Sequence, residues 1–344
     1  MTKAKLHFQD GTIIEGTSFG YEKSVAGEIA FSTGMMGYPE SLTDPSYKGQ
    51  ILTLSYPLVG SYGVAKRETW ESGNIQVSGL IVSQYIDTPS HFQSTMSLGQ
   101  WLKAEQIPAL EIPDTRFIVQ KIRDEGAALV KIEFEKKIDF IDPNKKNLVA
   151  EVSIDRTQVI GKGRKNVILV DCGVKENIIR ELIRRKVQVT RVPWDFDFVE
   201  AGLQYDGVLI SNGPGDPKMA DKTISVVKKV MQKKTPILGI CLGNQILALA
   251  AGGDTYKLPF GHRGQNQPCM LVGSKRCYIT TQNHGFAIGK IPSGFTPWFV
   301  NCNDQTNEGI IHKTLPFMSV QFHPEAAPGP VDTTWIFDKF VEFL

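Results

Sequence analysis

The sequence contains no long apolar run and no excess of either charge. No stretch approaches the roughly 18 uninterrupted apolar residues of a membrane-spanning helix, and the first residues, MTKAKLHFQDGTIIEG, lack the apolar core of a signal peptide. They are not rich in arginine and serine, as a transit peptide would be. Because 38 basic residues nearly balance 36 acidic ones, attraction to nucleic acid or to an acidic membrane is not expected. A cytoplasmic globular protein is therefore predicted.

Closely spaced cysteines and a phosphate-binding loop are also missing. The cysteines are odd in number and widely spread, which favours reduced thiols over a disulfide framework; they are Cys172, Cys241, Cys269, Cys277 and Cys302. None lies in a C-x-x-C pair, so a structural zinc site is not expected. The chain has no G-x-x-x-x-G-K-[ST] motif, and any ATP chemistry must therefore reside elsewhere. We expect no metal and no cofactor in this chain.

The length of 344 residues suits two domains, and the hydrophobic patterns predict that both are α/β. In residues 1–150, KLHF and TIIEG flank the turn Asp10-Gly11 and predict a β-hairpin. The later segment DTRFIVQKIRDEG has helical spacing up to a stop at Gly126, so helices should pack on this sheet and give a mixed α/β domain. Composition then shifts toward Gly, Lys and Arg, which predicts a linker over residues 151–166.

Residues 167–344 alternate between apolar strands and amphipathic helices. NVILVDCG is typical of a buried parallel strand, KENIIRELIRRK follows with a helical stripe, and the alternation repeats through YDGVLISNGPGDP and PILGICLGNQILALAAGG. Repeated βα units predict a doubly wound, largely parallel sheet. In such sheets ligands bind outside the carboxyl ends of the strands. The glycine loops SNGPGDP and GICLG both lie at such ends, so they can face one site.

Cys241 is the most reactive candidate because of its setting in GICLG. The pentapeptide has the G-x-nucleophile-x-G form of a strand-to-helix elbow, in which larger side chains would collide with neighbouring backbone. The N–H groups and dipole at the start of the following helix would stabilise a thiolate and could form part of an oxyanion hole. Free cysteine is also among the most buried residue types, however. The pentapeptide alone therefore fits a nucleophile and a core thiol equally well.

A nucleophilic thiol needs a base and a group that orients the base. His323 follows the apolar strand FMSVQF, and Glu325 lies two residues later, where it can hold one ring nitrogen while the other faces the thiol. A histidine at a strand end is more often structural when taken alone. His284 in QNHGF is the competing base, and the other four histidines have no comparable setting.

Taken together, the motifs resemble a known family. GICLG followed by HPE resembles the Cys-His-Glu triad of class I glutamine amidotransferases. LSYPLVGSYG, TGMMGYPESLTDPSYKGQ, LISNGPGDP, QNHGFA and QFHPEAAPGP narrow the resemblance to the small, glutamine-hydrolysing subunit or domain of carbamoyl-phosphate synthetase. The similarity covers nearly the whole chain, including the N-terminal half that other class I amidotransferases lack. The implied activity is hydrolysis of L-glutamine to glutamate and ammonia, with ammonia passed to a large synthetase subunit or fused domain.

The resemblance also implies roles for individual residues. Cys241 would attack the carboxamide carbon and form a thioester, His323 would move the protons, and Glu325 would orient His323. Backbone N–H groups of Leu242 and Gly213 would form the oxyanion hole. The implied glutamine pocket is lined by Ser46, Gly215, Gln245, Asn283, Gly285 and Phe286.

These pocket assignments have simpler alternatives and further consequences. Ser46 could be an ordinary turn residue beside Pro45, and Phe286 could belong to the core. As a pocket residue, Ser46 would place the active site at the interface of the two domains. ATP, bicarbonate and magnesium would be used by the partner synthetase. The sequence does not distinguish a pyrimidine from an arginine pathway.

Asn244 departs from the family pattern, in which GICLGHQ is the common form. The missing histidine is not the triad base, so the predicted mechanism survives, but the rate of glutamine hydrolysis is in question because asparagine cannot carry a positive charge near a thiolate. A second hypothesis is therefore a weakly catalytic scaffold that binds and regulates the synthetase. A third is another thiol hydrolase that acts on γ-glutamyl compounds, which would leave the N-terminal half unexplained.

Overall fold

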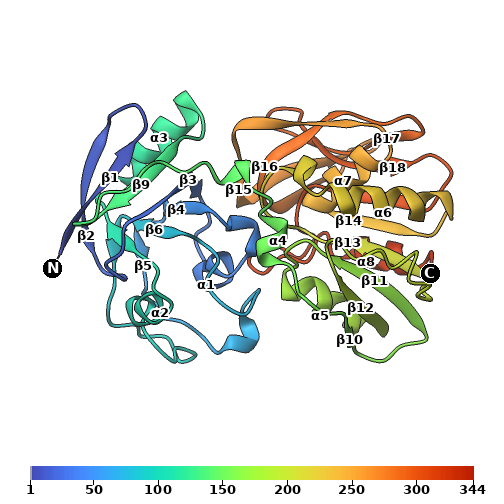
Figure 1. Ribbon diagram of the computed structural model, residues 1–344, viewed down its shortest axis with the longest axis horizontal. Coiled ribbons are helices and arrows are strands. Elements are labelled where there is room, and N and C mark those ends of the chain that lie inside the picture. The colour runs from blue at the N-terminus through green and yellow to red at the C-terminus, as the bar shows by residue number, and fades with distance from the viewer. Residues whose placement is uncertain (1) are drawn as a thin grey trace. The chain divides into compact units, whose positions relative to one another are not determined.

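The computed structural model describes residues 2–344 and divides into two compact units, Met1–Lys145 and Lys146–Leu344 (Figure 1). The division falls five residues before the expected end of the first domain at 150. Residues 151–166, expected to be a linker, contain a strand, β10 (Gln158–Ile160), that pairs with the sheet of the second unit. No helix among residues 2–344 has the length and apolar character needed to cross a bilayer.

The first unit is built on a closed barrel with strand order β1-β2-β8-β6-β4-β3-β9. The predicted hairpin is confirmed, because β1 and β2 pair antiparallel around Gly11. Strands β3, β4, β6 and β8 run parallel to their neighbours in this set, and antiparallel pairs complete the barrel. The strands are β1 (Lys3–Phe8), β2 (Ile13–Ser18), β3 (Val25–Ser32), β4 (Gln50–Leu54), β6 (Gly79–Val82), β8 (Ala109–Glu111) and β9 (Leu129–Glu133).

The expected helices of the first unit are α2 (Leu98–Ala104) and α3 (Thr115–Glu125). Helix α2 begins with a capping box between Ser97 and Gln100, and α3 ends at Gly126, whose φ of 94° favours glycine. The shorter elements of this unit are α1 (Tyr38–Leu42), η1 (Pro45–Tyr47), β5 (Leu58–Val59), η2 (Arg67–Thr69), β7 (Gln84–Tyr85) and η3 (Pro143–Lys145).

The second unit contains a ten-stranded sheet in the order β10-β12-β11-β13-β14-β19-β18-β17-β15-β16. The predicted parallel sheet is present from β12 to β19, and the remaining strands extend it with antiparallel pairs. Its further strands are β11 (Lys165–Asp171), β12 (Val187–Pro193), β13 (Gly207–Ile210), β14 (Ile237–Ile240), β15 (Asp254–Leu271), β16 (Cys277–Lys290), β17 (Phe295–Asn301), β18 (Asn307–His312) and β19 (Phe317–Val320).

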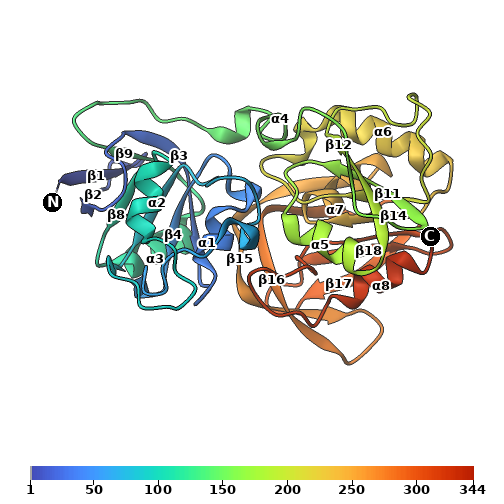
Figure 2. The ribbon, with the colours of Figure 1, turned by 90° about the horizontal axis from the view of Figure 1, so that it is seen from below.

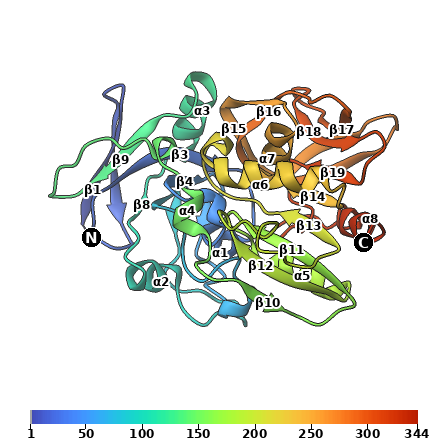
Figure 3. The same ribbon diagram turned by 45° about the vertical axis from the view of Figure 1, so that its right-hand side comes forward.

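Helices cover both faces of this sheet (Figures 2 and 3). The helices are α4 (Val149–Val152), α5 (Glu176–Arg184), η4 (Pro217–Met219), α6 (Asp221–Gln232), α7 (Leu242–Ala250) and α8 (Trp335–Val341). In β11, Ile168 and Val170 pack with α6 and α7, whereas Val167 and Leu169 pack with α5 and α8. A strand buried on both faces explains the continuous apolar run NVILV. The sheet thereby holds the carboxyl ends of β11, β13, β14 and β19 at one edge.

Candidate functional site

Cys241 occupies a sharp turn between β14 and α7. Its backbone has a φ of 55° and a ψ of −103°, a conformation that residues with a side chain rarely adopt. A Cβ on Gly239 would lie 2.5 Å from the carbonyl oxygen of Gly243, and a Cβ on Gly243 would lie 2.1 Å from that of Ile210. Both flanking glycines are therefore required by space, as the elbow motif predicts. The turn leaves the thiol at the start of α7.

His323 and Glu325 form a buried pair directly after β19. His323 Nδ1 lies 2.6 Å from Glu325 Oε1, and both side chains are at most 1% exposed. Burial alone would lower the pKa of His323, but the negative charges of Glu325 and Cys241 outweigh burial and raise this pKa to about 10. No group among residues 2–344 hydrogen-bonds His323 Nε2 in the resting geometry. The distal nitrogen is thus free for proton transfer while the carboxylate fixes the ring.

Lys175 joins this pair, and the sequence motifs did not identify it. Its Nζ lies 3.2 Å from Glu325 Oε1 in a setting where the lysine side chain is only 2% exposed, and it also donates to the carbonyl oxygen of Ala326. Burial would raise the pKa of Glu325, but the charges of Lys175 and His323 lower it to about 2. Lys175 follows the carboxyl end of β11, so the rule that placed the two glycine loops could also have pointed to it.

The surroundings of the thiol contain several predicted pocket residues. Cys241 Sγ lies 3.6 Å from the carbonyl oxygen of Asn283 on β16. A Cβ on Gly213 would lie 2.8 Å from a methyl carbon of Leu242, so the residues predicted to supply both oxyanion donors are neighbours. Gly215 has a φ of 81°, in keeping with a tight loop. The second unit therefore brings the GICLG turn, the SNGPGDP loop and the QNHGF segment of strand β16 together around Cys241.

Gln245 connects α7 to this strand. Its Nε2 donates to the carbonyl oxygen of Phe286 at 2.7 Å and to Gln321 Oε1 at 3.1 Å, and the side chain is buried. Gly285 and Phe286, which the resemblance also assigns to the pocket, are partly exposed on the same strand. Gln245 is thus a buried residue whose side chain connects α7 to strand β16.

Asn244 is completely buried and points toward the end of β19. Its Nδ2 donates to Gln321 Oε1 at 3.0 Å, and its Oδ1 accepts from Ser319 Oγ at 2.8 Å. Both partners are neutral, and both ends of the amide are satisfied. Asn244 therefore acts on the site through the network that it shares with Gln245, not through a hydrogen bond to the thiol.

Ser46 and His284 were also predicted as site residues, and each has other partners within its own unit. Ser46 lies in the first unit, in η1, where its backbone N–H donates to Asp44 Oδ1. Its contribution to a pocket beside Cys241 stays a prediction. His284, the competing base, has both ring nitrogens near other acceptors, at 2.9 Å from the Phe286 carbonyl oxygen and 3.2 Å from Gln282 Oε1. Its ring is thus engaged away from the thiol, which favours His323 as the base.

Of the other four cysteines, Cys172 and Cys269 have settings that suit packing in the core. Cys172 and Cys269 are buried, and burial raises the pKa of each thiol far above its ordinary value. Cys277 is exposed, and its Sγ lies 3.6 Å from that of Cys302. None of the four lies on an elbow. Among the five cysteines, all of which lie in the described residues 2–344, Cys241 is therefore the one whose backbone presents the thiol at a helix start.

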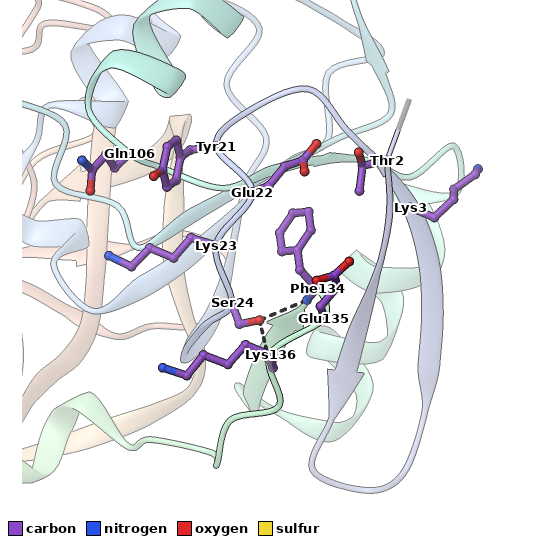
Figure 4. Close-up of a pocket in the computed structure, with 10 residues that line it drawn as sticks. All are labelled: Thr2, Lys3, Tyr21, Glu22, Lys23, Ser24, Gln106, Phe134, Glu135 and Lys136. Carbon is purple, nitrogen blue, oxygen red and sulfur yellow. Dashed lines mark hydrogen bonds between the residues drawn. The ribbon is translucent and has the colours of Figure 1, made fainter.

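A separate cavity of about 600 Å³ lies in the first unit and contains no residue predicted for catalysis (Figure 4). Its rim carries exposed lysine and glutamate side chains, and Phe134 lines its wall. Ser24 Oγ bridges one side by donating to the Lys136 carbonyl oxygen and accepting from the Phe134 N–H. The charged groups of this cavity remain accessible to water, in contrast to the buried groups around Cys241.

Comparison with protein families gives two matches that divide the chain as the two units do. The description Glutamine amidotransferase class-I matches residues 168–343, just over half of the chain. The description Carbamoyl-phosphate synthase small chain, CPSase domain matches residues 6–132. Both matches are to the kinds of domain that the sequence motifs resemble.

Individual relatives extend this result. The chain is 51% identical over 357 residues to carbamoyl-phosphate synthase (ammonia), mitochondrial, of Aquarana catesbeiana, and 45% identical over 384 residues to multifunctional protein URA2 of Saccharomyces cerevisiae. These alignments cover 99% and 98% of this chain but only 24% and 17% of the relatives. A solved structure of a putative GMP synthase component from Thermoplasma acidophilum is 26% identical, with a TM-score of 0.46, and covers 52% of this chain and 93% of that one. The chain thus spans about a quarter of the length of the Aquarana catesbeiana protein and less than a fifth of the length of the Saccharomyces cerevisiae protein.

Proposed function

This chain belongs to the class I glutamine amidotransferase family and carries the small-chain domain of carbamoyl-phosphate synthase, and on that basis we propose that it is the glutaminase component of a glutamine-dependent synthetase. It would hydrolyse L-glutamine to glutamate and ammonia. The ammonia would be delivered to a large synthetase chain or fused domain, which would use ATP, bicarbonate and magnesium. This chain would need no cofactor for the hydrolysis itself.

The observation that carries the proposal is the combination of the Cys241 elbow with the buried His323–Glu325 pair. An elbow alone fits a nucleophile or a core thiol, and a histidine–carboxylate pair alone fits a structural role. Together they supply the nucleophile, the base and the orienting group that covalent catalysis needs. Lys175 adds to this support because it keeps Glu325 ionised inside the protein.

In the proposed reaction, His323 Nε2 already holds the proton of the thiol, and the Cys241 Sγ thiolate attacks the carboxamide carbon of glutamine. The tetrahedral oxyanion would be held by the backbone N–H groups of Leu242 and Gly213. Its collapse breaks the C–N bond, and His323 returns the proton so that ammonia leaves and a glutamyl thioester remains. His323 then removes a proton from water, which attacks the thioester, and the thiolate leaves with glutamate as the product.

Glutamine hydrolysis by the purified full chain tests the proposal, measured with and without a large synthetase chain. Activity in the wild type that disappears in Cys241→Ser supports the proposal, and equal rates in both proteins would contradict it. Carbamoyl phosphate synthesis from free ammonia in the assembled enzyme is the control. It should survive the substitution, since ammonia bypasses the glutaminase step; its loss would indicate a structural defect.

A second candidate function is a scaffold that binds and regulates the synthetase without rapid glutamine hydrolysis. Two observations favour it: Asn244 replaces the usual histidine, and the name of the Aquarana catesbeiana relative specifies ammonia. The scaffold predicts that synthetase binding persists in Cys241→Ser and that glutamine turnover is equally slow in both proteins. The relatives include proteins named as mitochondrial and as multifunctional, so the cytoplasmic location and the pathway stay predictions.

A further inference from the structure

A second buried histidine–carboxylate cluster lies outside the triad, and we propose that it binds a divalent transition-metal ion, with zinc as the best fit. The cluster consists of His262 on β15, His284 on β16 and Glu308 on β18. One ligand atom from each of the three lies within 4.8 Å of the others, and all three residues are buried. The proposal does not depend on the glutaminase activity.

The sheet topology brings these residues together. His262 and His284 are direct cross-strand partners in the β15–β16 pair, and their rings meet edge to face with centroids 5.0 Å apart. β18 reaches the same place through β17, which pairs with both β15 and β18. The sequence did not predict this cluster, because the three residues lie far apart in the chain on the separate strands β15, β16 and β18. The arrangement is a built feature of the sheet and not a surface cluster.

Glu308 is a buried carboxyl group whose nearest possible cations are the two histidines. Its side chain is fully buried, and among residues 2–344 no lysine or arginine lies within ion-pair distance of it. Oε1 is 3.2 Å from His262 Nδ1 and 3.2 Å from Asn301 Nδ2, whereas Oε2 has no hydrogen-bond partner in this part of the chain. Buried charges are normally paired or coordinate a metal. The unpartnered oxygen of Glu308 thus supplies a buried ligand atom that suits a cation.

The two histidines are oriented as metal ligands are. His262 Nε2 lies 2.8 Å from Asp304 Oδ2, and His284 Nδ1 lies 2.9 Å from the Phe286 carbonyl oxygen. If His262 Nε2 and His284 Nδ1 carry the protons that these acceptors receive, the other nitrogen of each ring has a free lone pair. These nitrogens, His262 Nδ1 and His284 Nε2, lie 3.2 Å and 4.0 Å from Glu308 Oε1. Outer acceptors of this kind usually fix the tautomer of a metal-bound histidine.

Hydrogen bonds alone leave one of the acceptors around His284 without a donor. A neutral imidazole ring can donate a hydrogen bond from one nitrogen only. Yet acceptors lie at both nitrogens, since Gln282 Oε1 is 3.2 Å from Nε2. A metal ion on His284 Nε2 resolves the excess of acceptors, because Nδ1 would keep its proton for Phe286 and Gln282 Oε1 could serve as a fourth ligand.

The donor set of two imidazoles, one carboxylate and one amide oxygen suits zinc better than calcium or magnesium. Zinc bonds of about 2.0–2.2 Å in a tetrahedron place ligand atoms roughly 3.3–3.6 Å apart. The ligand atoms of the three residues now lie within 4.8 Å of one another, so they would need to move about an ångström closer together. No position would remain open to a substrate, which indicates a structural ion. It would fix β16, the strand whose Asn283 carbonyl contacts the Cys241 thiol.

Metal content of the untagged full chain, measured by plasma mass spectrometry after gel filtration, tests the proposal. We expect about one zinc ion per chain, and at least a tenfold loss in Glu308→Gln. His91→Gln, which removes an exposed histidine of the first unit, is the matched control and should keep its zinc. Cobalt added to the chelated wild type should give a tetrahedral absorption spectrum that Glu308→Gln lacks, and zinc should raise the unfolding temperature of the wild type alone.

The second variant, His262→Asn, keeps the proposal testable if Glu308→Gln does not fold. It should also lose zinc while retaining the circular dichroism of the wild type. A wild-type chain that contains no metal and neither binds cobalt nor is stabilised by zinc would overturn the proposal, and would leave a proton shared by Glu308 and His262. Zinc content that is equal in wild type and in both variants would overturn it as well.

Discussion

Two buried histidine–glutamate pairs in the second unit differ in what completes them. His323 uses one ring nitrogen for Glu325 and leaves the other free, while Lys175 supplies the charge that keeps Glu325 ionised. His262 uses both nitrogens, for Glu308 and Asp304, and no lysine or arginine of the described chain approaches Glu308. The first pair has one ring nitrogen available for proton transfer, whereas both ring nitrogens of His262 lie beside carboxylate oxygens. A buried lysine and a free ring nitrogen are thus present in the pair proposed for catalysis and absent from the second pair.

The largest expected effect comes from exchanging histidine for asparagine in each pair. His323→Asn should lower the rate of glutamine hydrolysis by about 10³-fold, the middle of the usual range for general acid–base catalysis, because asparagine cannot carry the proton. His262→Asn should change this rate less than about tenfold, since His262 does not touch the thiol. Steady-state ammonia release measures both. Similar losses of the rate of glutamine hydrolysis in the two variants would contradict the proposal that only the His323–Glu325 pair takes part in catalysis.

Removal of the lysine should have the next largest effect. Lys175→Met leaves Glu325 buried without its cation, so the free energy of unfolding at neutral pH should fall by about 3 kcal/mol, the lower end for breaking a buried pair. Lys175→Arg is the matched control, because it keeps a positive charge beside Glu325. Glutamine hydrolysis should fall as well, because Glu325 no longer holds His323 in one orientation.

The pH dependence of Lys175→Met separates charge from packing. The pKa of Glu325 is about 2 in the folded protein, below the 4.5 of an ordinary glutamate, so its stabilising contribution is complete above pH 4.5 and is lost as the pH falls toward 2. The stability difference between wild type and variant should therefore narrow over that interval in urea titrations. A constant difference from pH 7 to pH 2 would mean that Lys175 acts through packing alone.

The smallest expected effect is that of Asn244→His. A neutral imidazole can donate to Gln321 Oε1 from one nitrogen and accept from Ser319 Oγ at the other, which reproduces the contacts of the asparagine. We expect glutamine turnover to change by less than about tenfold, or about 1.4 kcal/mol, with the unfolding temperature unchanged. A larger change in rate would show that a charge at this position acts on the thiol directly. No change at all would show that the position is neutral.

The parts of the site that the sequence predicted are those set by local geometry. The two glycines around Cys241 and the i, i+2 spacing of His323 and Glu325 are visible in a few adjacent letters, because an elbow and a strand end are local structures. Lys175 follows the end of a predicted strand and could have been found, whereas the Glu308 cluster depends on strand order in the sheet, which local patterns do not encode. The closed barrel of the first unit escaped prediction for the same reason, although its opening hairpin was predicted correctly.

The role predicted for Ser46 rests on the motif TGMMGYPESLTDPSYKGQ. Within its own unit Ser46 lies in η1, where its backbone N–H donates to Asp44 Oδ1. A Ser46→Ala variant would show whether this unit contributes to glutamine binding, through an increased KM at unchanged stability.

The central claim, that Cys241 is the nucleophile, is tested most directly by iodoacetamide labelling followed by mass spectrometry of each cysteine-containing peptide. Glutaminase activity should fall in proportion to the fraction of Cys241 that is alkylated, and glutamine should protect both the residue and the activity. Labelling of the exposed Cys277 should leave the activity unchanged. Activity that persists when Cys241 is fully alkylated, or that disappears while Cys241 remains unmodified, would contradict the account.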